Sequence, residues 1–253
     1  MAVSSLGATE GRRPSVRLRK LEDERWLAAA LLSPTAVLLG LFIAYPFFEG
    51  IMLSLSSARV GEPGEFVGFR NFFKLWNDNI FWTSVWNTFW YTAVTTVFKL
   101  ALGLWLAMLL NRHFRGKAIV RAFVLLPFII PTVLSTFAWK WMFDPTFSVI
   151  NWSLFKLGFI TQRINWLGDG DLAMASIMIV NIWRGVPFFA ISLLAGLQTI
   201  SPELNEAAAI DGARPWNRFW YVTWPLLLPV TMVVMLFSVI QTFADFQLVY
   251  VMT

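Results

Sequence analysis

The stretch WLAAALLSPTAVLLGLFIAYPFF, residues 26–48, decides the class of this fold. It runs for 23 residues without a charged side chain, and about 20 apolar residues allow a helix to cross the hydrocarbon core of a bilayer. A cleaved signal peptide has a shorter apolar stretch, of about 7 to 15 residues, followed by small residues. This stretch instead ends in the bulky residues Tyr45, Pro46, Phe47 and Phe48. We therefore predict a transmembrane helix that is retained in the protein.

Four further apolar runs follow, at residues 88–110, 122–142, 172–197 and 221–249. The segments between them are rich in Gly, Pro, Asp and Asn, which favour turns. Over the whole chain, 57% of residues are hydrophobic and 14% are charged, whereas a soluble domain carries about 25% charged residues. The sequence predicts an all-α fold, a polytopic transmembrane helix bundle with five spans in this chain.

Residue types that carry catalysis or bind metals are scarce. The chain has no cysteine and one histidine, His113, which stands among Arg112, Arg115 and Lys117. A disulfide scaffold, a thiolate nucleophile and a zinc cluster are therefore not expected. The phosphate-binding pattern G-x-x-x-x-G-K-[ST] does not occur either. We expect no catalytic residue, no metal and no cofactor in this chain.

The distribution of basic residues predicts the orientation. With the N-terminus inside the cell, the inside segments hold twelve Lys and Arg residues and the outside segments hold five. Because cytoplasmic loops carry the excess of Lys and Arg, we predict that the N-terminus is inside and that Thr253 is outside. Membrane topology then explains the net charge of +5, and we expect no nucleic-acid partner. The outside segments, residues 49–85 and 143–170, should contain turn-rich loops with short interfacial helices.

The inside segment between the fourth and fifth spans reads SPELNEAAAIDGARPWNRFWYVTWPLLLP, residues 201–229. Ser201 can cap a helix that starts at Pro202, and Gly212 can close that helix in a left-handed conformation. Three alanines, at 207–209, leave one side of the helix small enough for another protein surface to approach. From the residues alone, this element is either a docking helix or a plain connecting helix.

A resemblance to a known family favours docking. Glu206-Ala207-Ala208, then Gly212 after three intervening residues, then Leu228-Pro229, together resemble the EAA loop of inner-membrane permease subunits of binding-protein-dependent ABC importers. The stretches NIWRGVPFF at 181–189, NTFWYT at 87–92 and LLNRHFRGKAIVRAFVLLP at 109–127 are similar to the carbohydrate-uptake branch, the maltose and glycerol-phosphate permease group. The resemblance covers about residues 26–253.

The resemblance implies a multi-pass subunit of the cell (inner) membrane that imports a sugar or related polyol. Its expected partners are a second permease subunit, two nucleotide-binding ATPase subunits that bind ATP and Mg, an extracytoplasmic solute-binding protein and the lipid bilayer. We expect a cytoplasmic N-terminal arm at 1–25 and a permease domain at 26–253, with a cytoplasmic coupling helix at 201–213. The residues expected to couple to the ATPase are Glu206, Ala207, Ala208, Asp211 and Gly212. The alternatives are a passive channel and a membrane-embedded enzyme.

By the same resemblance, spans four and five hold the solute in the membrane. The residues that match this role are Asn181, Arg184, Gly185, Phe188, Thr242 and Asp245. The charges of Arg184 and Asp245 suggest a mutual ion pair, a clamp for polar or acidic groups of the solute, or both. Ser238, Gln241, Thr242 and Asp245 are expected on one face of the fifth helix. We also expect Pro187 to kink the fourth helix beside the arginine.

Two lysines inside spans receive different interpretations. Thr92, Thr95, Thr96, Lys99 and Gly103 recur every three to four residues, so this polar stripe should face the bundle. Lys99 then makes either a structural hydrogen bond or a contact with the solute. Lys140, near the outer end of span three, is interpreted as a snorkelling residue. Members of the family continue into a sixth span, which we expect to be missing from this sequence after Thr253.

Overall fold

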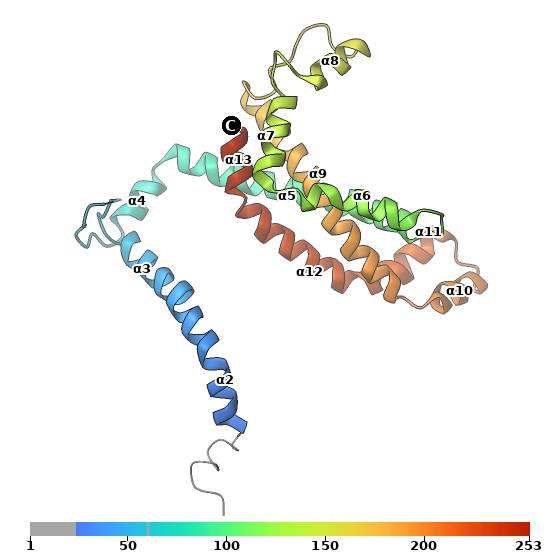
Figure 1. Ribbon diagram of the computed structural model, residues 1–253, viewed down its shortest axis with the longest axis horizontal. Helices are drawn as coiled ribbons and strands as arrows, with labels where there is room; N and C mark the ends of the chain where they lie inside the picture. The colour runs from blue at the N-terminus through green and yellow to red at the C-terminus, as the bar shows by residue number, and fades with distance from the viewer. Residues whose placement is uncertain (1–23, 60) are drawn as a thin grey trace, which may run out of the picture. The chain divides into compact units, whose positions relative to one another are not determined.

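The computed structural model describes residues 24–59 and 61–253. The expected N-terminal arm, residues 1–25, lies outside this part of the chain except for its last two residues. The described residues form helices joined by loops. They also form two isolated antiparallel β-bridges, Ser56 with Phe66 and Arg59 with Glu62. The chain divides into two compact units, residues 1–81 and 82–253, which are treated separately below. Figure 1 shows the order of the helices.

The first unit contains one long apolar helix. It consists of α2 (Glu24–Leu39), a π-helical turn η1 (Gly40–Ala44) and α3 (Tyr45–Ser54), and it runs for 31 residues without a buried side chain. The wide turn comes just before Pro46, which has no N–H to donate to the Phe42 carbonyl in a regular α-helix. This helix is long and apolar enough to cross a membrane, which confirms the prediction from residues 26–48.

A loop with a short helix, α4 (Arg70–Trp76), completes the described part of this unit. The Asn71 amide donates to the carbonyls of Ser54, at 2.9 Å, and Ser56, at 2.7 Å. These bonds tie the start of α4 to the end of α3, because they occupy carbonyls that have no partner within the preceding helix. The predicted short helix in this turn-rich segment is confirmed.

In the second unit, two long helices run through the bundle. The first, α5 (Asn79–Asn111), has 33 residues and starts nine residues before the predicted span. The second, α9 (Gly170–Thr199), has 30 residues. At its start, the Asp169 carboxylate accepts hydrogen bonds from the backbone N–H groups of Asp171 and Leu172, at 3.1 and 3.2 Å. The α-helix α9 continues without interruption past Pro187, which is buried.

The predicted third span is a bent pair of helices and not one straight helix. It consists of α6 (Lys117–Ile129) and α7 (Thr132–Met142), whose axes differ by 90° (Figure 1). Pro131 is the cause, because the residue before a proline is driven out of the helical region. Ile130 accordingly has φ −64° and ψ 129°. In the part of the chain that the structure describes, four helices can span a membrane, or five if this bent pair is one span.

The fifth span ends earlier than predicted. It consists of α11 (Pro215–Arg218), a second π-helical turn η2 (Phe219–Thr223) and α12 (Trp224–Phe243). A separate helix, α13 (Phe246–Met252), follows. Asp245 does not continue the face of α12 as predicted, because it caps α13, where its carboxylate accepts from the Leu248 N–H at 3.4 Å. The Lys140 ammonium of α7 is exposed and donates to the Val251 carbonyl of α13 at 3.0 Å.

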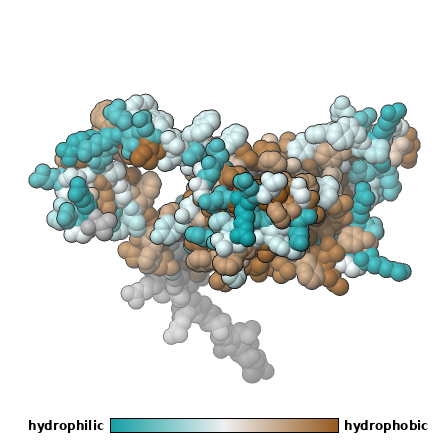
Figure 2. Space-filling model, turned by 90° about the horizontal axis from the view of Figure 1, so that it is seen from above, coloured by the Kyte–Doolittle hydropathy of each residue, from teal (hydrophilic) through white to brown (hydrophobic). Residues whose placement is uncertain are grey.

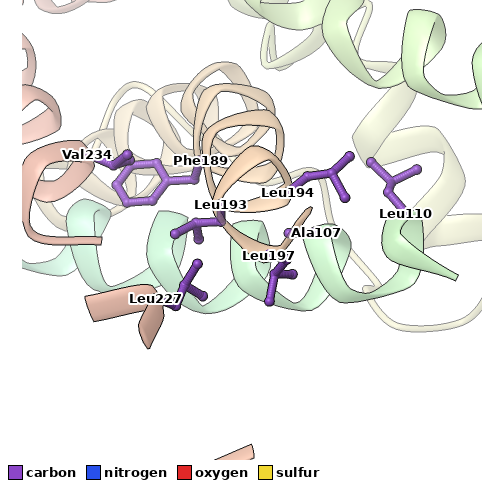
Figure 3. Packing of buried hydrophobic residues seen from close by; sticks show 8 residues of the cluster. All are labelled: Ala107, Leu110, Phe189, Leu193, Leu194, Leu197, Leu227 and Val234. Carbon is purple, nitrogen blue, oxygen red and sulfur yellow. The ribbon is translucent and has the colours of Figure 1, made fainter. Parts of the chain in front are cut away.

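Close approach of helices builds the core. The largest buried cluster joins α5, α9 and α12 through Ala107, Leu110, Phe189, Leu193, Leu194, Leu197, Leu227 and Val234 (Figure 3). A Cβ atom on Gly103 would clash with the Phe189 Cβ, so only glycine lets α5 pass α9 at this point. Small residues serve the same purpose in membrane helix pairs generally. Elsewhere, large apolar side chains lie on the outer surface of the helices (Figure 2), as expected where lipid is the solvent.

The loop between α7 and α9 carries the short helix α8 (Val149–Lys156). The Ser148 hydroxyl caps it by accepting from the Asn151 N–H at 3.0 Å. The Asn151 side chain is buried and bridges to the returning chain, donating to the Ile164 carbonyl at 2.9 Å and accepting from the Trp166 indole at 3.0 Å. This second turn-rich segment therefore also contains the predicted short helix.

Candidate functional site

A cavity of about 470 Å³ lies in the second unit, between α5, the bend of α6 and α7, α9 and the junction of α12 with α13. All six residues that the sequence placed on the predicted path line this cavity: Asn181, Arg184, Gly185, Phe188, Thr242 and Asp245. The structure therefore brings the two predicted groups, from α9 and from the end of α12, into one site. The remaining lining residues are Lys99, Phe128, Thr132, Phe189, Phe237, Ser238, Gln241, Ala244, Phe246 and Gln247.

Lys99 is the most deeply buried charge of the cavity. It is 3% exposed, and its ammonium donates to the Thr242 hydroxyl at 2.8 Å. The stripe to which it belongs faces the bundle, since Thr92, Thr95, Thr96 and Gly103 are buried as well, so that prediction is confirmed. The two interpretations of Lys99 are compatible here, because the lysine makes the hydrogen bond to a neighbouring helix and also lines the cavity.

Gly185 is required by the path of this lysine. A Cβ atom at position 185 would lie 2.6 Å from Cδ and 2.9 Å from Cε of Lys99. The lysine stem therefore lies against the backbone of α9, where any other residue would force it to move. The absence of a side chain at Gly185 thus allows the Lys99 stem to lie in this position.

An ion pair links α9 to the start of α13. The guanidinium of Arg184 lies 3.7 Å from the Asp245 carboxylate, and the Asn181 amide donates to the same carboxylate oxygen at 3.1 Å. The side chains of Arg184 and Asp245 are 26% and 12% exposed, so both are partly open to the cavity. Of the two roles suggested by the sequence, the structure shows the mutual ion pair. The break after Phe243 turns Asp245 toward the arginine.

Three phenylalanines form an apolar wall. The rings of Phe128 and Phe188 are stacked, with centroids 5.7 Å apart, and the Phe237 ring lies 5.7 Å from Phe188. Sequence reasoning found Phe188 but missed Phe128 and Thr132, which reach the cavity because the chain bends between α6 and α7. The available signal was the pair Pro127 and Pro131, which marked a break in an otherwise continuous apolar run.

The coupling-helix segment lies beyond the C-terminal end of α9. Its helix, α10 (Pro202–Ile210), begins at Pro202 as predicted, although the Ser201 hydroxyl makes no capping bond. Gly212 has φ +81°, and the N–H of the next residue, Ala213, bonds to the Ala208 carbonyl at 2.9 Å. This is the left-handed closure that the sequence predicted.

The five residues expected to couple to an ATPase lie together on this segment. Glu206, Ala207, Asp211 and Gly212 are exposed, and Ala208 is half-buried. Ile210 is 87% exposed, which is unusual for an isoleucine on a helix with one sheltered side. The Arg218 guanidinium of α11 donates to the Asn205 carbonyl at 3.4 Å and so joins α10 to the start of the fifth span.

Comparison with known proteins identifies the family. Residues 99–253 match the family described as binding-protein-dependent transport system inner membrane component. The chain belongs to this family. It is a multi-pass inner-membrane permease of the ABC importer type. Membership supports the importer permease over the passive channel and the membrane-embedded enzyme that the sequence left as alternatives.

Relatives of this permease extend over most of its length. It is 38% identical to the sulfoquinovosyl glycerol transport system permease protein SmoG of Agrobacterium fabrum, over 91% of this chain and 75% of that protein. It is 35% identical to the trehalose/maltose transport system permease protein MalF of Thermococcus litoralis, over 91% and 78%. It is 36% identical to the inner membrane ABC transporter permease protein YcjO of Escherichia coli, over 89% and 78%.

Solved structures share the fold. A bacterial ABC transporter involved in the import of the acidic polysaccharide alginate matches with a TM-score of 0.76 and 24% identity, over 90% of this permease and 77% of that chain. A second crystal structure, of a bacterial alginate ABC transporter in complex with an alginate pentasaccharide-bound periplasmic protein, matches with a TM-score of 0.75 and 25% identity, over 88% and 74%.

The cavity and α10 are separated along the permease. Arg184 lies near the middle of α9, 14 residues after Gly170 and 15 residues before Thr199. At 1.5 Å per residue, the cavity is about 20 Å from either end of this helix. The candidate site is therefore at mid-depth of a helix long enough to span the bilayer, whereas α10 follows the end of that helix.

Proposed function

We propose that this permease pairs with a second permease subunit and that the two enclose a translocation path for a sugar or related polyol. One observation carries the proposal: a cavity halfway along α9 combines hydrogen-bonding side chains with an aromatic wall. Sugars present hydroxyl groups at their edges and apolar C–H groups on their faces. The hydroxyl groups can bond to the polar side chains of the cavity, and the C–H faces can pack on the phenylalanine rings. The names of relatives include trehalose, maltose and sulfoquinovosyl glycerol.

The proposed role of α10 is to transmit ATP hydrolysis. In this proposal α10 docks into a groove of a cytoplasmic ATPase subunit through Glu206, Ala207, Ala208 and Asp211, while Gly212 sets the turn after it. Two such subunits, one for each permease, bind ATP and Mg. The bond from Arg218 to Asn205 supports this role, because it connects α10 to the span that ends at the cavity. Movement of α10 then rocks the spans between outward-facing and inward-facing arrangements.

The opposite side receives the solute. With the N-terminus inside, the loops that carry α4 and α8 face the outside and meet an extracytoplasmic solute-binding protein. The family is binding-protein-dependent by description, and the alginate transporter of similar fold was crystallised with its periplasmic protein.

The experiment is reconstitution of the complete complex in proteoliposomes. The cognate solute is first identified on the binding protein by a thermal-shift screen of sugars and polyols. We expect uptake of that solute only when ATP is inside with the ATPase subunits and the loaded binding protein is outside. Uptake without ATP would show a channel, and release of a chemically altered solute would show an enzyme; either result overturns the proposal.

A further inference from the structure

We propose that the solute carries a single negative charge, a carboxylate or sulfonate on the sugar, and that Lys99 binds this group together with Arg184. The proposal rests on the proposed function and names the substrate class of the same cavity. Two observations support it: the net charge of the residues that line the cavity, and the contacts that each charged side chain makes there.

The cavity walls carry an excess of positive charge. Among the residues that line it, Lys99 and Arg184 are cations and Asp245 is the sole anion. The other lining residues are apolar side chains, hydroxyl groups, amides and glycine. The cavity therefore has a net charge of about +1 at the mid-depth of a membrane-spanning helix, where an uncompensated charge is costly.

The single anion is already engaged. Its carboxylate faces the Arg184 guanidinium at 3.7 Å, accepts from the Asn181 amide at 3.1 Å and caps α13. Within the described residues, the hydrogen bond that Lys99 makes is to the neutral hydroxyl of Thr242. A hydroxyl offsets the desolvation of an ammonium only in part, since a buried charge is stabilised chiefly by an opposite charge. Among the described residues, Lys99 is thus the cavity cation that has no carboxylate within ion-pair distance.

Lys140, a lysine on α7, differs from Lys99 in its surroundings. Lys140 on α7 is exposed and reaches the Val251 carbonyl at the end of α13. The charge of Lys140 is therefore not enclosed by the protein. Lys99 is 3% exposed, and its stem lies against the backbone of α9 at Gly185.

The donors around the cavity suit an anion. An ammonium has three N–H donors, and Thr242 accepts one of those of Lys99. The Nε atom of Arg184 is buried and has no hydrogen-bond partner among the described residues. Charge-assisted hydrogen bonds from ammonium and guanidinium groups to carboxylate or sulfonate oxygens are stronger than those to sugar hydroxyls. One negative charge would bring the cavity to neutrality, whereas a phosphate dianion would exceed it.

The test measures equilibrium binding to the complete, nucleotide-free transporter in lipid nanodiscs, by calorimetry. Four probes share one ring: glucose, glucuronate, 6-deoxy-6-sulfoglucose and glucose 6-phosphate. We expect glucuronate or the sulfonate to bind at least tenfold more tightly than glucose and more tightly than the phosphate. Whichever monoanion binds more tightly identifies carboxylate or sulfonate as the group. A preference below threefold, including no measurable binding of any probe, overturns the proposal.

Two variants of Lys99 and one matched control variant assign the preference to this lysine. Lys99→Met should reduce it below threefold, Lys99→Arg should retain most of it, and the matched control Lys140→Met should leave it unchanged. Size-exclusion chromatography shows whether each variant assembles. If Lys99→Met does not assemble, the binding of the four probes to the wild-type transporter still tests the charge proposal. Equal loss in both methionine variants overturns the assignment to Lys99. ATP-dependent uptake of a neutral sugar would overturn the charge proposal while leaving the importer function intact.

Discussion

Lys99 and Thr242 are 143 positions apart in the sequence, and a hydrogen bond of 2.8 Å joins their side chains between α5 and α12. The bond lies at the cavity wall, one residue before α12 ends at Phe243. It therefore fixes the end of the fifth span to the middle of the second and holds the lysine ammonium at the edge of the cavity.

Replacement of Thr242 by valine tests this bond. Thr242→Val keeps the shape of the side chain but removes the acceptor, and an unsatisfied buried donor costs about 1–3 kcal/mol. We expect lower thermal stability of the purified complex and weaker solute binding. Ser238→Ala, in the same helix and cavity, is the control, since no side-chain hydrogen bond of Lys99 goes to it. Equal effects of the two substitutions would show that the bond has no special role.

A methyl group at position 185 tests the packing of the lysine stem. In Gly185→Ala, the added Cβ would meet Cδ of Lys99 at 2.6 Å, so the lysine stem must shift. We expect solute affinity to fall at least tenfold while the ATPase subunits still copurify with the complex. The matched control is Gly170→Ala on the same helix, where an added Cβ would meet nothing within 4 Å. Unchanged affinity in Gly185→Ala would contradict the described path of Lys99.

Much of this arrangement could be predicted from the sequence, because polar residues stand out within apolar spans. Arg184, Thr242 and Asp245 stood out in this way. The resemblance to the permease family assigned the solute role to them and to Asn181, and the four residues line one cavity. Helical periodicity also placed the stripe of Lys99 toward the bundle. Polar groups in a transmembrane helix must be kept away from lipid. This constraint acts on each helix separately, so the sequence of one helix shows which of its faces points to the bundle.

The features that the sequence did not predict are breaks in helices. Residues 122–142 are apolar throughout except for Lys140 and a few hydroxyl groups, so hydropathy alone predicts one span, although Pro131 redirects the chain by 90°. Likewise, a 3.6-residue period continues from Ser238 to Asp245 past the true end of α12. Asp245 is a good N-cap residue, but its choice between extending α12 and capping α13 depends on Arg184 and Asn181, which are distant in sequence. Such tertiary contacts leave no mark in a local pattern.

The two partners of the ion pair between Arg184 and Asp245 should differ in how much stability their replacement costs. Asp245→Asn leaves two cations without an anion, whereas Arg184→Gln leaves Asp245 with the Asn181 amide and the Lys99 charge nearby. We therefore expect Asp245→Asn to lose more stability, by about 1–3 kcal/mol because both side chains are partly solvated. Thermal unfolding of the two single variants and the double variant gives the coupling energy. Equal losses in the single variants would contradict this asymmetry, and additivity in the double variant would contradict an interacting pair.

The turn after α10 gives the last prediction, on the proposed transmission of ATP hydrolysis. Gly212 has φ +81°, a conformation that β-branched residues strongly disfavour and that asparagine tolerates. Gly212→Val should therefore distort the closure of α10 and lower solute-stimulated ATP hydrolysis at least tenfold, and Gly212→Asn should keep most of it. Solute binding to the transporter should not change in either variant, because the cavity lies about 20 Å away along α9. Full coupling in Gly212→Val would sink the proposed role of α10, as would a loss of solute binding that matches the loss of hydrolysis.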